Sequence, residues 1–106
     1  MLVLIPHSTV LPRPLPDGTD VVRYHTAVDA VVAIKAGDGP AVILSDGLLE
    51  SADALAFAIK TSGRSAIEVR GERWDGETES PLSASCRGVI AGFGPAGVLV
   101  AIGVSL

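Results

Sequence analysis

The chain has 106 residues, enough for one domain with a single modest core. Hydrophobic residues make up 48% of it and aromatic residues only 4%, so Ala, Val, Ile and Leu must build the core, which favours helices packed on a parallel sheet. The net charge of −4 without a basic stripe argues against nucleic-acid binding, and the single cysteine, Cys86, excludes an internal disulfide and suits a reduced, cytoplasmic setting.

The first half of the chain predicts two short strands and one helix. Leu2 to Ile5 form a continuously apolar strand, typical of burial on both faces. Residues 6–18 hold four of the seven prolines and predict an extended connection, after which Val21 to Tyr24 form a second strand. Thr26 then fits the N-cap of a helix that has Asp29 at its third position.

The middle of the chain predicts two strands with a helix between them. Ala41 to Leu44 are again entirely apolar, and Ser51 caps a helix that ends at Gly63. Residues 65–70 alternate apolar and charged side chains, which predicts a half-exposed strand towards an edge of the sheet. Residues 71–85 are polar and turn-rich and predict a loop or a hairpin.

The last nineteen residues, Gly88 to Leu106, carry no charged side chain. Their length is at the lower limit for a membrane-spanning helix, but Pro95 and the glycines around it would break such a helix. A strand over 89–93 and a helix over 96–104 account for the same residues, and we expect no membrane span. The whole pattern predicts a single three-layer α/β domain over residues 1–106, with a mostly parallel sheet of about five strands and three helices.

The final helix has no polar face, so it needs cover on every side. A small sheet covers one side of it, and the apolar surface that remains is typical of a contact between copies of the chain. The residues expected at this interface are Val98, Leu99, Ile102 and Leu106.

Residues that follow strands are the candidates for chemistry, because the crevice of an open α/β sheet lies beyond the carboxyl ends of its strands. His7 and Asp46 would form an acid/base pair if their strands were neighbours, although a polar strand end and a turn also explain them. The turn GFGPAG precedes the last helix, whose N-terminal amides favour an anion or a developing oxyanion. The alternative, which the sequence favours, is that the glycines of this turn allow the helix to pack closely on the sheet. The residues expected at such a site are Gly92, Gly94, Ala96 and Gly97.

The sequence contains no metal-ligand spacing, and we expect no metal site. Cys86 precedes Arg87, a cation that would favour the thiolate, but the sequence favours a buried and inert thiol.

Residues 41–106 resemble the crotonase (enoyl-CoA hydratase-like) superfamily in two segments, AVILSDGLLESADALAF and CRGVIAGFGPAGVLVAIGV. In that family the two regions supply the backbone N–H groups that hold a thioester carbonyl. The resemblance implies an acyl-CoA ligand, with donors near Ala52 and near Gly94 or Ala96. No catalytic pair of glutamates can be placed in the chain.

The segment VVRYHTAVDAVVAIKAGDGPAVILSDG resembles the second strand, helix and third strand of response-regulator receiver domains. Asp46 would match the phospho-acceptor, but His7 and Ser8 stand where that family has an acidic pair. This resemblance implies a pseudo-receiver scaffold for signalling.

Taken together, these patterns predict a small self-associating binding or assembly module without catalytic activity, whose partner is another copy of itself. An acyl-thioester binding protein or enzyme is the alternative, with acyl-CoA as its ligand, and a pseudo-receiver signalling domain is a further one. No cofactor is otherwise expected, and neither nucleic acid nor a membrane is expected as a partner.

Overall fold

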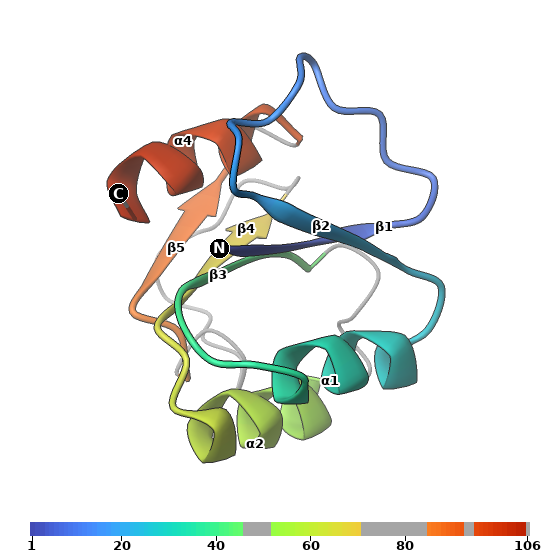
Figure 1. The fold of residues 1–106 in the computed structure, drawn as a ribbon, viewed down its shortest axis with the longest axis vertical. Coiled ribbons are helices and arrows are strands. Elements are labelled where there is room, and N and C mark those ends of the chain that lie inside the picture. Colours follow the sequence, from blue (N-terminus) through green and yellow to red (C-terminus); the bar gives the residue numbers. More distant parts are fainter. Residues whose placement is uncertain (46–51, 71–84, 93–94, 106) are drawn as a thin grey trace.

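The computed structural model describes residues 1–45, 52–70, 85–92 and 95–105 of the chain (Figure 1). Within these ranges the strands are β1 (Leu2–Pro6), β2 (Asp20–Tyr24), β3 (Ala41–Leu44), β4 (Ala66–Arg70) and β5 (Gly88–Ala91). The helices are α1 (Ala27–Lys35), α2 (Ala52–Ser62) and α4 (Ala96–Ser105). The predicted strands and helices are therefore confirmed, with the last strand ending at Ala91. The expected cap Ser51, the end of the predicted strand at residue 93 and residues 71–84 of the expected loop or hairpin lie outside the described ranges.

The five strands form one sheet in the order β2-β1-β3-β4-β5, and every neighbouring pair is parallel. Helices α1 and α2 cover one face of this sheet, and α4 lies on the other face (Figure 1). The predicted three-layer α/β architecture with a parallel sheet is confirmed.

Apolar strands bury both of their faces. Along β1, Leu2 and Leu4 belong to the core cluster under α1 and α2, whereas Val3 and Ile5 belong to the cluster under α4. Strand β3 divides its four side chains between the two clusters in the same way. Because successive side chains of a strand point to opposite faces, a continuous apolar run is what a central parallel strand requires.

The expectation that residues 65–70 form a half-exposed strand near an edge is wrong. Strand β4 lies between β3 and β5, and the side chain of Glu68 is 0% exposed. Alternation of apolar and charged residues is typical of a solvated face, but it also fits a central strand when the buried charge has partners. Glu68 has such partners.

The proline-rich connection takes the place of a helix between β1 and β2. It rises on the same side of the sheet as α4 (Figure 1). Leu11 and Leu15 from this connection pack against the core cluster under α4, beside Val3 and Val98. The connection is therefore part of the outer layer that closes this face of the sheet.

None of the helices in the described part of the chain is long and apolar enough to cross a membrane. Helix α4, which carries no charged side chain, has 10 residues.

Candidate functional site

The strand order identifies one position where a crevice is favoured. Strands β1 and β3 are neighbours, and the segments that follow them lie on opposite faces of the sheet. The connection after β1 packs on the α4 side, whereas α2, which follows β3, packs on the other. Ligands of doubly wound sheets bind at such a reversal, beyond the carboxyl ends of the strands.

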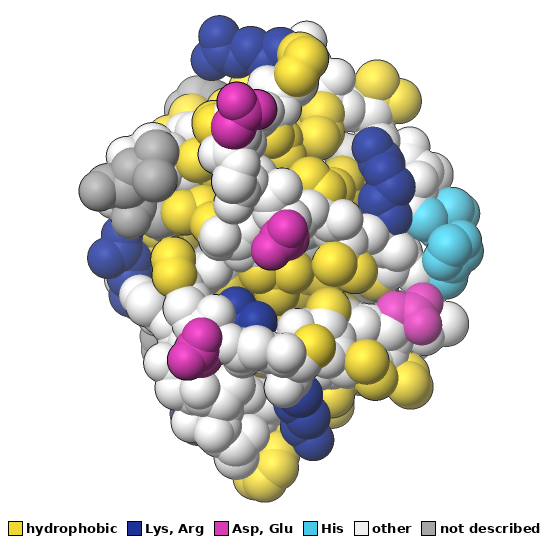
Figure 2. Space-filling model, viewed as in Figure 1, with side chains coloured by type: hydrophobic (Ala, Val, Ile, Leu, Met, Phe, Trp, Pro, Cys, Tyr) yellow, Lys and Arg dark blue, Asp and Glu magenta, His cyan; other side chains and the backbone are white. Residues whose placement is uncertain are grey.

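Two histidines stack at this edge. Pro6 of β1 and Tyr24 of β2 are register partners, so the residues after them, His7 and His25, leave the sheet side by side. The His7 amide donates to the Tyr24 carbonyl at 3.0 Å, which extends the ladder by one bond. The two imidazole rings have centroids 4.3 Å apart and planes inclined by 13°. Figure 2 shows the histidine side chains together at one margin of the molecule.

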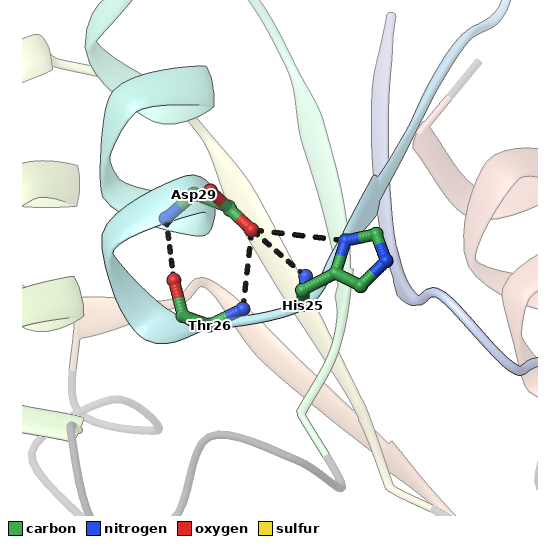
Figure 3. Close-up of polar contacts among 3 residues, drawn as sticks. All are labelled: His25, Thr26 and Asp29. Carbon is green, nitrogen blue, oxygen red and sulfur yellow. Dashed lines mark hydrogen bonds and ion pairs between the residues drawn. The ribbon is translucent and has the colours of Figure 1, made fainter.

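His25 is fixed by the start of α1 (Figure 3). The Asp29 carboxylate accepts hydrogen bonds from the amides of His25 at 2.9 Å and Thr26 at 3.2 Å, and the Asp29 amide donates to the Thr26 hydroxyl at 3.3 Å. This is the predicted capping arrangement of Thr26 and Asp29. The same Asp29 oxygen lies 3.9 Å from Nδ1 of His25.

These contacts also set the charge of Asp29. The backbone N–H groups of His25 and then Thr26 lower the pKa of the carboxyl, with a smaller contribution from the His25 side chain. Asp29 is therefore a carboxylate at neutral pH, positioned next to the histidine pair.

Arg23 supports the backbone around His7. Its guanidinium donates to the carbonyl of Thr9 at 2.6 Å and to that of His7 at 3.4 Å. The start of the proline-rich connection is thereby tied to β2.

A second polar group lies inside the sheet, under α1 and α2. Glu68 accepts hydrogen bonds from the Ser45 hydroxyl at 2.7 Å and from Nε of Arg70 at 2.6 Å. Ser45 is 1% exposed and follows β3 directly, so these bonds join the carboxyl ends of β3 and β4. A buried carboxylate is tolerated when a charged hydrogen bond compensates its desolvation, and Arg70 supplies that bond.

Burial has a different effect on Cys86. It raises the pKa of the thiol to about 12, first through desolvation and second through the negative charge of Glu68. Of the two alternatives drawn from the sequence, these surroundings favour the inert thiol over activation by the adjacent Arg87, and the reactivity itself stays a prediction.

The expected acid/base pair is placed only in part. Strands β1 and β3 are neighbours, as the pair requires, and His7 lies exposed at the edge of the sheet. Asp46 lies outside the described residues, so its pairing with His7 and its match to a receiver phospho-acceptor stay predictions.

The expected ligand-binding residues lie at the starts of two helices. Gly92 has a φ of 88° and is exposed, and Ala96 begins α4, followed by the buried Gly97. Ala52 begins α2 on the opposite face of the sheet, and Gly94 lies outside the described residues. An oxyanion hole needs both donors within hydrogen-bond distance of one oxygen. That convergence stays a prediction.

The expected interface residues occupy different environments. Val98 is 0% and Ile102 is 3% exposed, because both face the sheet, so the chain's own core covers them and they are not available to a partner. Leu99 is half-buried, and Leu106 lies outside the described residues. The exposed large hydrophobic residues of α4 are instead Val100 and Val104, which the sequence analysis did not single out.

The sequence analysis also missed the histidine pair and the buried Glu68. His7 and His25 are 18 positions apart, and only the parallel pairing of β1 with β2 unites them. A signal existed, because each histidine follows an expected strand directly, but strand order was needed to use it.

A comparison with protein-family models found no match to this chain, and a comparison with curated protein sequences found no relative.

Proposed function

We propose that this chain is a self-associating module, in which two copies meet through the outer edge of β5 and the adjoining exposed side of α4. The observation that carries the proposal is an uncharged strand edge lying beside exposed valines. The proposal involves no catalytic step.

The two edges of the sheet differ in charge. Strand β2 exposes Asp20 and Arg23, and charges of this kind protect a strand edge against pairing with another chain. The residues of β5, Gly88–Ala91, include no charged side chain, and all four are partly exposed. Among the described residues, no strand pairs with the outer side of β5. Its backbone groups are thus available for strand addition.

The helix beside this edge continues the apolar surface. Val100 is 45% and Val104 is 60% exposed on α4, one helical turn apart. A groove of about 450 Å³ lies between the helix and the strand, lined by Ile67, Arg87, Gly88, Val89, Ile90 and Val104. Arg87 is the one charged residue in this lining, and its guanidinium donates to the Val104 carbonyl at 3.3 Å.

Other exposed apolar residues are interrupted by charge. On α1, Val28 and Val32 stand beside the exposed Asp29 and Lys35. On α2, the exposed Phe57 has Asp53 and Lys60 on the same side of the helix. Scattered apolar residues among charges are ordinary surface, whereas a contiguous apolar area with a single charge, Arg87, favours an interface.

A two-fold axis suits this surface. An isologous contact brings the same patch from each copy together, and two β5 edges related by a two-fold axis run antiparallel. The sheet would then continue from one copy into the next, with the valines of α4 closing over the junction.

The oligomeric state tests the proposal through a matched pair of variants. Val104→Lys places a charge on the proposed surface, and Val32→Lys places the same charge on α1 at a residue of equal exposure, 60% against 61%. Sedimentation velocity over a hundredfold range of micromolar concentrations should show the wild type and Val32→Lys at twice the mass of one chain. Val104→Lys should sediment as a monomer at the same concentrations.

Two results would contradict the proposal. One is a wild-type chain that stays monomeric over the whole range. The other is a dimer that both lysine variants weaken equally, since the contact would then lie elsewhere. Circular dichroism of all three proteins verifies that each substitution leaves the fold intact.

A further inference from the structure

We infer that His7 and His25 together bind one late first-row divalent metal ion, such as Cu²⁺, Ni²⁺ or Zn²⁺, within a single chain. The inference concerns the carboxyl edge of β1 and β2, at the opposite side of the sheet from β5. It therefore stands independently of the proposed self-association.

The backbone holds both ligands in place. Register pairing of Pro6 with Tyr24 sets the two histidines on adjacent strands, and the bond from the His7 amide to the Tyr24 carbonyl continues that register. His25 is further held by its amide bond to the Asp29 carboxylate. Two imidazoles attached to fixed, neighbouring backbones lose little additional freedom when one ion joins them.

The separation of the two imidazole rings is close to the separation that binding to one metal ion requires. With metal–nitrogen bonds of about 2.0 Å, two imidazoles on one ion have centroids about 4.5–5 Å apart. The observed separation is 4.3 Å, with the planes inclined by 13°. Binding therefore requires a small parting of the rings and a turn from a parallel stack into a V. Both side chains are at the surface, His25 with 66% of its side chain exposed, so rotation about their own bonds supplies that change.

The charges around the pair admit a cation. The Asp29 carboxylate lies 3.9 Å from Nδ1 of His25, and a negative charge at this distance favours a cation bound by the pair. Arg23 brings a positive charge to this part of the chain, and its guanidinium is engaged by the carbonyl oxygens of Thr9 and His7. Imidazole ligands favour Cu²⁺, Ni²⁺ and Zn²⁺ over Mg²⁺ and Ca²⁺, with Cu²⁺ bound most tightly.

The site has two protein ligands. Among the described residues, no group of three or more His, Cys, Asp and Glu side chains is arranged to hold a metal ion. Water would complete the coordination, so the ion remains open to exchange. The chain contains only two histidines, which leaves no other imidazole to compete.

Calorimetric titration of the full chain with Cu²⁺ and with Zn²⁺ at pH 7.5 tests the inference. We expect one ion per chain, with Cu²⁺ bound more tightly than Zn²⁺. Loss of an outer-shell partner typically weakens metal binding by about 10–100-fold. The variants His7→Asn and His25→Asn each lose a direct ligand, so each should weaken Cu²⁺ binding by more than this. Cys86→Ser should bind as the wild type does, since burial keeps that thiol protonated.

A measurement on the wild type alone guards against misfolded variants. Substoichiometric Cu²⁺ should broaden amide NMR signals around residues 7 and 25 and leave those of α4 sharp. The inference is overturned by a wild type that binds no Cu²⁺ at about 100 μM, by full affinity in either histidine variant, or by a stoichiometry of one ion for two chains.

Discussion

The thiol of Cys86 lies in surroundings that oppose its ionisation. Desolvation and the carboxylate of Glu68 raise its pKa to about 12. The thiolate fraction at pH 8 is then about a thousandfold below that of an ordinary thiol with a pKa near 8.5. Burial and Glu68 both oppose ionisation of this thiol, while the adjacent Arg87 directs its guanidinium to the carbonyl of Val104.

We predict that the folded chain reacts with a thiol reagent such as DTNB at pH 8 at least about a hundredfold more slowly than the chain in concentrated urea, because attack requires the thiolate. The absorbance of the released thiolate gives both rates. Arg87→Gln should react as slowly as the wild type. A folded chain that reacts as fast as the unfolded one, or a clear slowing in Arg87→Gln, would show that the thiol is activated.

Glu68 shows where sequence reasoning reaches its limit at the scale of a residue. The alternation of Ile67, Glu68, Val69 and Arg70 fits a solvated strand face, and nothing local in the sequence reveals that Ser45 and Arg70 supply partners. One of these partners is 23 positions away. A buried charge becomes predictable only when the neighbouring strand is known, because its desolvation has to be compensated across the sheet.

At the scale of elements, the start of α1 is determined by a short stretch of sequence. Thr26 and Asp29 satisfy each other's backbone amides, and Asp29 additionally accepts from His25. All of these contacts lie within five consecutive residues, so the capping box could be predicted in advance. The strands β1 and β3 were equally predictable, because each is a continuous apolar run in the local sequence.

Strand order was not predictable in the same way. Nothing in the segment 88–91 distinguishes an edge strand from a central one, yet β5 lies at the edge and β4 inside. Which residues of α4 face the sheet could not be predicted either, because the sequence of a helix that is apolar on all sides does not indicate which side is buried.

The start of α1 carries a pH-dependent contribution to stability. The folded pKa of Asp29 lies below its unfolded value, because the ionised form accepts the amide hydrogen bonds of His25 and Thr26. The stability that it contributes is fully present above the unfolded pKa, near 3.9, and is lost as pH falls through the lower folded pKa. Asp29→Asn removes this contribution.

We therefore expect wild type to be more stable than Asp29→Asn at pH 7, with the difference shrinking as the pH falls below the unfolded pKa and through the lower folded pKa of Asp29. Urea unfolding followed by circular dichroism at several pH values measures it. Asp38→Asn serves as a control, because Asp38 lies in the turn after α1, outside the capping box. A difference between wild type and Asp29→Asn that stays constant from pH 7 down to the acid limit at which the wild type still folds would contradict this account.

At the scale of the whole molecule, the two faces of the sheet are covered by different means. One face has α1 and α2, which contact each other and enclose a cluster that includes Leu4, Ile43 and Leu55. The other face has α4 and the proline-rich connection, which together cover Ile5, Leu44 and their neighbours. On this face a segment without regular secondary structure covers the sheet where a second helix would otherwise lie. Its prolines reduce the conformational entropy that this segment loses on folding.

The connection should therefore contribute to global stability through its leucines. Leu15 packs against the core cluster under α4 and shares a groove of about 390 Å³ with Leu99 and Ile102. Full burial makes Leu→Ala cost about 2–5 kcal/mol, and the half-buried Leu15 should cost about 1–2 kcal/mol of the free energy of unfolding. Val10 in the same connection is 82% exposed, so Val10→Ala should change stability by less than about 0.5 kcal/mol.

Urea unfolding of the two variants shows whether the proline-rich connection stabilises the fold or only links β1 to β2. If the connection closes the face beside α4, Leu15→Ala lowers the midpoint while Val10→Ala leaves it in place, with the slope of the transition unchanged in both. Equal midpoints for Leu15→Ala, Val10→Ala and the wild type would mean that α4 alone closes this face. The apolar surface available to a second copy of the chain would then extend from β5 across α4 towards β1, because among the described residues the connection is the segment beside α4 that packs over this face.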